Sequence, residues 1–252
     1  MNIVIPMAGA GIRFKDHGFS LPKPLIKIND TSMIKVVIDN LKPKRTHRFI
    51  FLCQTDHINK FGLEVKLKQW APNSIIIKVD GLTNGAAITV LKSKDFINNY
   101  QPLMIANCDQ YIDFDINRYL DYMSDSDRDG LIMTMTSTDP KWSYVKLDSN
   151  GIVTNLVEKV VISNEATVGI YNYKFGKEFV DAAEEMVSNE IKTNGEFYVA
   201  PAYNGMIKNG KKIGIMNIGT EGVGMHGLGT PEDYFRFLKH PISSRLKVDN
   251  PR

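Results

Sequence analysis

Short, continuously apolar runs alternate with longer amphipathic stretches through the first half of the chain. Apolar runs without polar alternation are typical of strands buried on both faces, and the amphipathic stretches between them predict helices. The alternation of strand and helix therefore indicates an α/β fold with a parallel sheet between two layers of helices. The expected strands are 2–7, 48–53, 74–79 and 103–106, and the expected helices are 31–41, 56–70 and 85–96.

The second half has a different pattern, in which apolar and polar residues alternate as they do in antiparallel strands. Asn150-Gly151 predicts a hairpin turn, because both residues adopt positive φ readily. The two patterns together predict a mixed sheet in a single domain over 1–240, followed by a polar tail at 241–252. The expected strands are 130–137, 144–147, 152–157, 166–173 and 212–216, and the expected helices are 177–189, 198–208 and 231–239.

Composition excludes several classes of protein. The chain has 31 Lys and Arg against 28 Asp and Glu, a formal net charge of +3, and 43% hydrophobic residues, so it is an ordinary globular chain. The basic residues are scattered, which argues against a nucleic-acid partner and favours a small anionic ligand. With no signal-peptide pattern and no run of about 18 apolar residues, we expect a cytoplasmic protein without a membrane partner. Cys53 and Cys108 are expected to be free, buried thiols.

Three loops that each follow a predicted strand carry the candidate chemistry. Ligands of a parallel sheet bind beyond the carboxyl ends of its strands, so the loops at 8–24, 80–85 and 107–109 should meet at one site. The side chains of these loops include the amide of Asn107 and the carboxylates of Asp80 and Asp109. A single site formed from three separate segments is therefore expected.

The first loop is rich in glycine, and a lysine between two prolines follows it. Its glycines alone fit a plain turn; a dinucleotide-binding fingerprint would need a glycine at Phe14 and a helix directly after it, whereas no helix is expected before about residue 32. A phosphate-binding P-loop would need a Gly-Lys-Ser/Thr sequence, which is missing. Lys23, fixed between prolines, can direct its charge at a phosphate, and Arg13 offers a planar fork of donors. The backbone N–H groups of Ala8, Gly9, Ala10 and Gly11 can approach a phosphate closely.

These motifs form part of a longer series. Gly9-Ala10-Gly11-Ile12-Arg13-Phe14 and Pro22-Lys23-Pro24-Leu25 are followed by Asn107-Cys108-Asp109, Glu158-Lys159, Gly169-Ile170-Tyr171, Gly195-Glu196-Phe197-Tyr198 and Gly229-Thr230-Pro231-Glu232-Asp233. In this order they resemble the signature of the sugar-phosphate nucleotidylyltransferases along nearly the whole chain. The resemblance implies a Rossmann-like, three-layer mixed sheet of the GT-A type. It also implies an enzyme that joins a nucleoside triphosphate to a phosphorylated small molecule and releases pyrophosphate. A homo-oligomer is compatible with this expectation.

The resemblance implies roles for individual residues, with the nucleotide in the half 1–110 and the acceptor in the half 111–240. Arg13 would bind the leaving pyrophosphate, Lys23 the α-phosphate and Lys159 the acceptor phosphate, because the reaction needs charge neutralisation rather than a protein nucleophile. The residues implied to bind the nucleotide are Ala8, Gly9, Ala10, Gly11, Asp80, Gly85, Ala86 and Asn107. Those implied to bind the acceptor are Trp142, Tyr144, Glu158, Gly169, Tyr171 and Glu196.

The implied cofactor is Mg²⁺, held by Asp109. The family usually places a second metal-binding aspartate where this chain has Gly227. Either Asp109 and the phosphates suffice, or the metal is held differently. His226 is a weak alternative ligand, because Mg²⁺ prefers oxygen.

The base and the acceptor are less determined. An ionised Asp80 only accepts hydrogen bonds, which favours the cytosine amine and therefore CTP, with Gly85 bringing backbone close to the ring; alternatively Asp80 only caps a turn. Trp142-Ser143 replaces the family's Tyr-Gly at the acceptor site, which argues against a hexose 1-phosphate. The chain also resembles capsule-synthesis cytidylyltransferases that use phosphoglutamine. A sugar-1-phosphate nucleotidylyltransferase using UTP, dTTP or GTP is the alternative.

Two rival functions remain open at this point. Asp113-Phe114-Asp115 matches the D-x-D metal motif of GT-A glycosyltransferases, although carboxylates are also expected where a helix begins, near Ile116. A regulatory module that binds a nucleotide without turnover is the second rival. Lys23 and Lys159 favour the enzyme over both.

Overall fold

The computed structural model describes residues 1–246, and its elements follow the expected alternation. In the first half they are β1 (Asn2–Met7), α1 (Ile12–Asp16), the 3₁₀ helix η1 (Lys23–Leu25), β2 (Lys27–Ile28), β3 (Thr31–Ser32), α2 (Met33–Leu41), β4 (Arg48–Gln54), α3 (Thr55–Phe61), α4 (Leu63–Trp70), β5 (Ile75–Val79), α5 (Ala86–Leu91), α6 (Lys94–Ile97), β6 (Leu103–Ala106), β7 (Gln110–Ile112) and α7 (Ile116–Asp125). In the second half they are β8 (Gly130–Thr136), β9 (Ser143–Leu147), β10 (Val153–Glu158), β11 (Glu165–Tyr173), α8 (Gly176–Ser188), α9 (Ala202–Lys208), β12 (Ile213–Glu221), β13 (Gly224–Gly227), α10 (Pro231–Lys239) and the 3₁₀ helix η2 (Pro241–Arg245).

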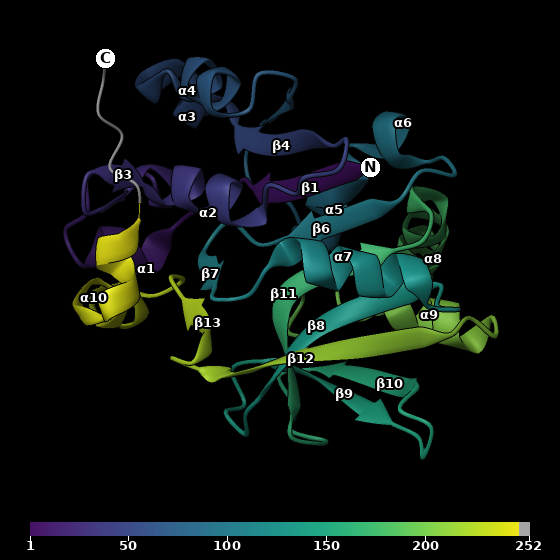
Figure 1. Ribbon diagram of the computed structural model, residues 1–252. Helices are drawn as coiled ribbons and strands as arrows, with labels where there is room; N and C mark the ends of the chain where they lie inside the picture. Colours follow the sequence, from purple (N-terminus) through teal and green to yellow (C-terminus); the bar gives the residue numbers. More distant parts are fainter. Residues whose placement is uncertain (247–252) are drawn as a thin grey trace.

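One mixed sheet runs through the molecule (Figure 1). β5, β4, β1 and β6 lie side by side in parallel, so their carboxyl ends share one edge of the sheet. β11 pairs with β6 in the antiparallel sense and thereby joins the second half of the chain to the first. Beyond β11 the sheet continues through β8, β12, β13 and β7, and the β9–β10 hairpin is attached to β11.

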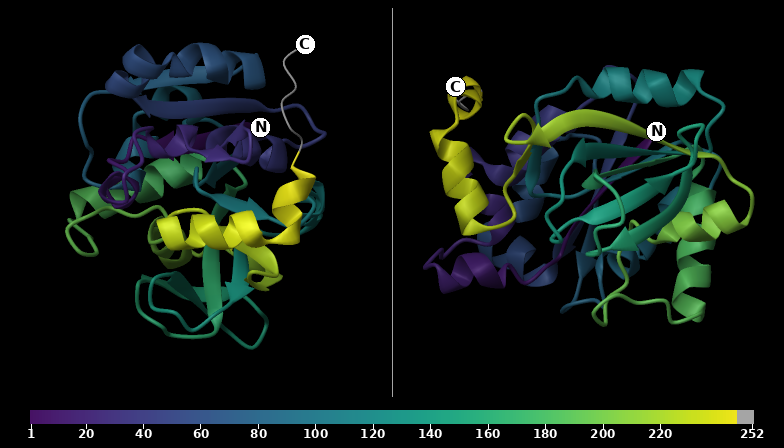
Figure 2. Two further views of the ribbon diagram at one scale, coloured as in Figure 1. Left: turned by 90° about the vertical axis from the view of Figure 1, so that its left-hand side faces the viewer. Right: turned by 90° about the horizontal axis from the view of Figure 1, so that it is seen from below.

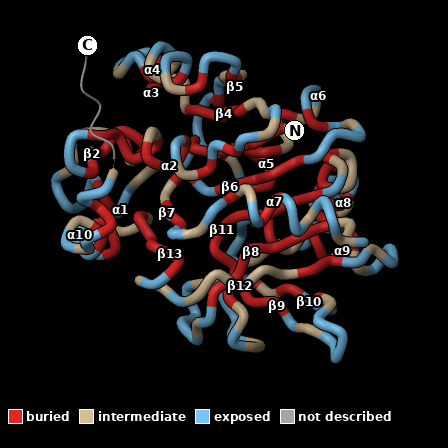
Figure 3. The backbone as a smooth tube through the Cα atoms, viewed as in Figure 1, coloured by how far each residue is buried: buried red, intermediate tan, exposed pale blue. Residues whose placement is uncertain are grey.

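Helices cover both faces of this sheet, and strand β1 shows how its side chains divide between them. Ile3 and Ile5 belong to a core layer shared with α2, α4 and α7, whereas Val4 belongs to the layer shared with α5, α8 and α9. Figure 3 shows buried backbone concentrated in the central strands. Burial on both faces explains why these strands are continuously apolar. The predicted three-layer α/β fold with a mixed sheet is confirmed.

A third, smaller cluster connects the first loop to the C-terminal helix. The Phe14 and Phe19 rings meet edge to face at 5.2 Å between centroids, and Tyr234 of α10 lies 6.1 and 5.6 Å from them. The Tyr234 hydroxyl donates to the Lys27 carbonyl oxygen at 2.6 Å. The right-hand view of Figure 2 shows α10, in yellow, beside the purple segment that follows β1. The loop that follows β1 is therefore fixed from behind by a helix more than two hundred residues away in sequence.

One prediction about the first loop is wrong. No helix was expected before residue 32, but α1 begins at Ile12, directly after Gly11. Gly11 has a φ of 63°, a left-handed conformation that a glycine adopts without strain, and the turn lets the N–H groups of Phe14 and Lys15 bond to the Gly11 carbonyl. The helix has only five residues, too few to show a hydrophobic period in the sequence.

Other boundaries differ from those expected. The helix predicted over 56–70 is interrupted at Gly62, whose φ is 61°, and the one over 85–96 divides into α5 and α6. The strand predicted over 212–216 extends to Glu221, and the helix predicted from residue 198 begins at Ala202. Strands β2, β3, β7 and β13 were not expected, because they are short and, unlike the four apolar residues of β6, contain no continuous apolar run.

Tyr119 provides a test of how helix α7 is attached to the sheet. Its ring is fully buried and its hydroxyl donates to the Leu131 carbonyl of β8 at 2.6 Å. We expect Tyr119→Phe to lower the free energy of unfolding by about 1 kcal/mol, the usual contribution of one internal hydrogen bond. Tyr122 on the same helix is 44% exposed, so Tyr122→Phe is the matched control. Chemical denaturation of both variants measures the difference, and equal stability would contradict the assignment.

Candidate active site

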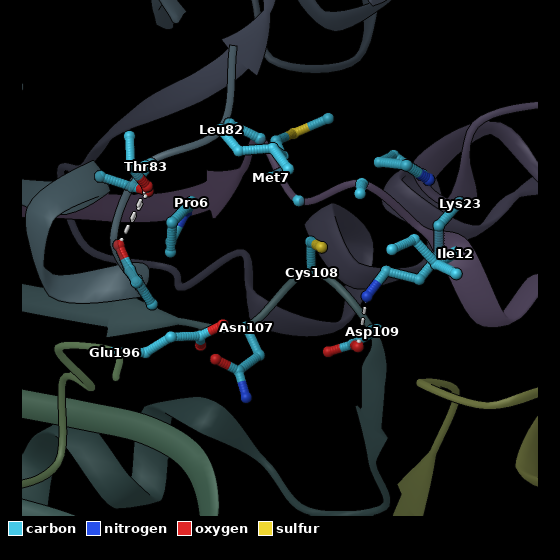
Figure 4. Close-up of a pocket in the computed structure, with 17 residues that line it drawn as sticks. Pro6, Met7, Ile12, Lys23, Leu82, Thr83, Asn107, Cys108, Asp109 and Glu196 are labelled. Atoms are coloured by element: carbon cyan, nitrogen blue, oxygen red, sulfur yellow. Dashed lines mark hydrogen bonds and ion pairs between the residues drawn. The ribbon is translucent and has the colours of Figure 1, made fainter. Parts of the chain in front are cut away.

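A cavity of about 420 Å³ opens beyond the carboxyl ends of β1, β5 and β6 (Figure 4). All three loops that we expected to meet there contribute to its wall. The first loop contributes small residues together with Ile12 and Lys23, the second leads into the N-terminal end of α5, and the third contributes Asn107 and Asp109. The lining residues that the sequence predicted are Ala8, Gly9, Ala10, Lys23, Gly85, Ala86, Asn107 and Asp109.

The first and third loops are joined by an ion pair. Lys23 donates to an Asp109 carboxylate oxygen at 2.7 Å, and both side chains are about one-fifth exposed. Burial alone would lower the pKa of Lys23, but the neighbouring Asp109 carboxylate outweighs it and raises that pKa above its ordinary value. Lys23 therefore remains a cation at neutral pH. Pro22 and Pro24 fix the backbone on either side, as the sequence led us to expect.

A second cavity, of about 280 Å³, adjoins the first and shares Lys23, Asn107 and Asp109 with it. Arg13 from α1 and Lys159 from the end of β10 line this cavity as well. The structure thus brings together the three residues expected to neutralise phosphates, although they come from positions far apart in the sequence. Concentrated positive charge in a cavity attracts a polyanion.

Lys141 is a fourth cation at this cavity, and the sequence analysis missed it. Its Nζ lies 3.0 Å from a Glu221 carboxylate oxygen and 4.0 Å from one of Asp233, and it sits 4.8 Å from the centroid of the Trp142 ring. Burial would lower the pKa of Lys141, but the hydrogen bond to Glu221 and the nearby carboxylates raise it. Its place beside the altered Trp142-Ser143 motif is the one signal that could have found it.

A third cavity, of about 170 Å³, lies next to Asn107 and is formed mainly by the second half of the chain. Glu158 lies at its wall with only 7% of its surface exposed and accepts a hydrogen bond from the Ser143 hydroxyl. Burial raises the pKa of Glu158 above its ordinary value, against the lowering effect of that hydrogen bond and of Lys159. The expected acceptor residues that line this cavity are Trp142, Glu158, Gly169 and Tyr171.

Four of the expected site residues lie elsewhere. Asp80 is exposed and accepts a hydrogen bond from the Thr55 hydroxyl at 2.6 Å. Neither Asp80 nor Gly11 lines any of the three cavities. Tyr144 was expected at the acceptor site but is fully buried, with its hydroxyl donating to the Asp139 carbonyl at 2.7 Å. Glu196 lines the first cavity rather than the third.

The residues around Asp109 can be tested for a fit to Mg²⁺. Within residues 1–246 no group of three or more His, Cys, Asp or Glu side chains could hold a metal by itself. A side chain at Gly229 would come within 2.9 Å of an Asp109 oxygen, so the glycine leaves room beside that carboxylate. One carboxylate with open space beside it fits Mg²⁺, which binds through one or two carboxylates together with substrate phosphates. His226 does not fit, because it is buried against Phe237 and His240.

The D-x-D motif has a structural role. Asp115 is the N-cap of α7, and its carboxylate accepts from the Asn117 backbone N–H at 2.9 Å. Neither Asp113 nor Asp115 lines any of the three cavities. No helix within residues 1–246 is long and apolar enough to cross a membrane.

Solved structures with the same fold include several enzymes that act on nucleotides. A nucleoside-diphosphate-sugar pyrophosphorylase from Vibrio cholerae RC9 is 23% identical and superposes with a TM-score of 0.80 over 94% of this chain and 99% of its own. A putative glucose-1-phosphate thymidylyltransferase from Bacillus anthracis is 18% identical, with a TM-score of 0.74 over 100% and 97%. The inositol-1-phosphate CTP transferase from T. maritima is 12% identical, with a TM-score of 0.75 over 99% and 98%.

At these identities the superpositions establish the fold, and the sequence itself provides the assignment. No curated protein matches the chain in a direct sequence comparison. The model of the family described as nucleotidyl transferase, in contrast, matches residues 3–214, which include nearly all of β1, the three loops of the first cavity and the residues that line the third cavity. The match therefore covers the greater part of the chain, and the protein is an enzyme that belongs to the nucleotidyl transferase family.

Proposed function

We propose that this nucleotidyltransferase joins CTP to a phosphorylated small molecule and releases pyrophosphate. The observation that carries the proposal is the pair of adjoining cavities that share Lys23, Asn107 and Asp109. One cavity has room for a nucleotide against the first loop, and the other is lined by four cations and two carboxylates. Two phosphorylated substrates that repel each other need this arrangement in order to approach.

The reaction needs no protein nucleophile. The acceptor phosphate oxygen attacks the α-phosphorus in line, and pyrophosphate leaves, so the protein contributes positioning and charge neutralisation. Lys23 acts at the α-phosphate, Arg13 at the departing pyrophosphate, and Lys159 at the acceptor phosphate. Asp109 keeps Lys23 oriented toward the cavity through their ion pair.

Asp109 would hold Mg²⁺ at the same site together with substrate phosphates. When bound, the ion supplies charge neutralisation on the triphosphate. Asp233 is the other carboxylate at the cationic cavity, but it accepts from Thr230 and lies within 4.0 Å of Lys141. The Gly227 position contributes no side chain.

The third cavity, which we call the acceptor cavity, supports a small, polar acceptor rather than a hexose. It presents charges of both signs, the Lys141 ammonium and the Glu158 carboxylate, and Trp142 forms part of its wall. An amino-acid phosphate carries complementary groups beyond its phosphate, so we propose phosphoglutamine, in the synthesis of capsule or surface-polysaccharide precursors. A sugar 1-phosphate with UTP, dTTP or GTP is the second candidate, favoured by the solved relatives described as UDP-glucose pyrophosphorylase and thymidylyltransferase.

The direct test is a matrix of assays. The protein is incubated with each of the common nucleoside triphosphates and a panel of phosphorylated metabolites, including phosphoglutamine and hexose 1-phosphates, and pyrophosphate is measured. Pyrophosphate release only with CTP and phosphoglutamine supports the full proposal, and release with a sugar 1-phosphate selects the second candidate. Nucleotide binding without pyrophosphate release from any pair would instead indicate a binding module.

Lys23 is the first target for mutation. We expect Lys23→Ala to lower kcat/KM by about a hundredfold or more, the usual effect of removing one electrostatic stabiliser, while the fold survives. Lys15 is exposed on the neighbouring helix α1 and lines none of the cavities, so Lys15→Ala is the matched control. Steady-state kinetics and thermal unfolding of both variants provide the comparison. Near-normal turnover in Lys23→Ala would remove this lysine from the mechanism.

Asp109→Asn tests the metal site. The neutral amide is a poorer ligand for a hard cation, so we expect either the activity or its dependence on Mg²⁺ to be lost. Titration of Mn²⁺ into the enzyme–CTP complex, followed by electron paramagnetic resonance, measures metal binding independently of turnover. Asp113→Asn, at an exposed position outside the cavities, is the control. Unchanged activity and unchanged metal affinity in Asp109→Asn would place the ion elsewhere.

Asp80 tests the choice of base. If its carboxylate accepts from cytosine N4, CTP is preferred to UTP by about 1–3 kcal/mol, the usual size of one matched base contact. To do so it must use the oxygen that Thr55 leaves free, or exchange Thr55 for the base. Asp80→Asn is expected to narrow the CTP/UTP ratio, because an amide can donate to uracil O4. Paired kinetics with both nucleotides decide the matter, and an unchanged ratio means that Asp80 does not read the base.

A further inference from the structure

The segment 193–198 runs from the first cavity, which we call the nucleotide cavity, to the acceptor cavity. It begins on a tight turn, in which Thr193 and Glu196 exchange two backbone hydrogen bonds of 3.0 Å. The two residues between them, Asn194 and Gly195, have φ values of 50° and 79°. Positive φ at both central positions defines the tight I′ class of turn, for which Asn-Gly is the preferred sequence. The turn therefore fixes the position from which the backbone continues to residues 197 and 198.

Phe197 attaches this segment to the wall of the nucleotide cavity. Its N–H donates to the Asn84 carbonyl at 2.8 Å, and its own carbonyl accepts from the Ala87 N–H at 3.0 Å. A side-chain carbon at Gly85 would lie 2.6 Å from the Phe197 nitrogen, so only glycine permits this approach. Gly85 itself lines the nucleotide cavity. The two backbones are thus in direct contact.

Tyr198, the next residue, holds Lys159 on the other side. Its hydroxyl accepts from the Lys159 ammonium at 2.7 Å, and the same ammonium lies 4.8 Å from the centroid of the Tyr198 ring. The Lys159 backbone is also constrained, because its φ is 58° and its N–H donates to the Trp142 carbonyl at 3.0 Å. An ammonium held by a hydroxyl loses part of the freedom of its four-carbon stem.

We propose that Tyr198 is a positioning residue for Lys159, which it holds in a place fixed relative to the nucleotide cavity. The connection runs from Gly85 through the Phe197 backbone to the Tyr198 side chain and from there to the ammonium. Because the acceptor oxygen must approach the α-phosphorus in line, a cation positioned relative to the nucleotide is more useful than a free one. The inference rests on the proposed function, in which Lys159 binds the acceptor phosphate.

Tyr198→Phe removes the hydroxyl and keeps the ring. It is expected to lower kcat by about tenfold, as befits the loss of a hydrogen bond to a charged group, while the Kd of CTP measured calorimetrically without acceptor and the melting temperature stay unchanged. A merely structural role would instead lower the melting temperature and affect CTP binding. Tyr122→Phe, which removes an exposed hydroxyl from α7, is the matched control. Wild-type kcat in Tyr198→Phe would overturn the proposal.

A double-mutant cycle shows whether Tyr198 acts through Lys159. In a Lys159→Met background, Tyr198→Phe is expected to cause no further loss of kcat, because the cation that it positions is gone. An equal, additive loss in both backgrounds would mean that Tyr198 acts independently of Lys159, and would refute the proposal.

A third measurement needs no substrate. Acetic anhydride modifies free lysine amines, and peptide mass spectrometry reports the rate at Lys159 relative to the exposed Lys146. We expect faster modification of Lys159 in Tyr198→Phe than in the wild type, whereas equal rates would contradict the proposed contact. Faster modification combined with no pyrophosphate from the wild-type protein would refute the proposed function while leaving the contact established.

Discussion

The ion pair between Lys23 and Asp109 connects the two loops on which the rest of the site depends. Each partner alone would be a costly, partly buried charge, and together they hold the loops after β1 and β6 in one geometry. The pairing is possible because β1 and β6 are neighbouring parallel strands, whose carboxyl ends deliver both loops to the same edge. The strand order of the sheet thus determines which lysine meets which carboxylate.

The walls of the first and third cavities differ in composition. The wall of the first cavity combines small residues, Ala8, Gly9 and Gly85, with the polar side chains of the third loop. The wall of the third cavity comes mainly from the second half of the chain and includes Glu158 and Trp142. Because a few precisely placed polar side chains determine which small molecule a pocket binds, the choice of acceptor in the proposed reaction depends on the wall of the third cavity.

The sequence was sufficient to predict the layers of the fold and the convergence of three loops, because both follow from strands that are apolar throughout and from the shared edge of a parallel sheet. The sequence was not sufficient where the direction of a side chain decides whether a residue lines a cavity. The resemblance implied that Tyr144 binds the acceptor, but its side chain is fully buried, and Asp80 is hydrogen-bonded to Thr55. Lys141 and Tyr198 gain their importance only from tertiary partners, Glu221 and Lys159, far away in the chain.

The aromatic cluster of Phe14, Phe19 and Tyr234 has a consequence for the order in which the packing of the first loop is completed during translation. The helix that packs behind the first loop is synthesised more than two hundred residues after that loop. The first loop therefore acquires this support only once α10 has been made, and the packing of the loop cannot be completed by the segment from β1 to β6 alone.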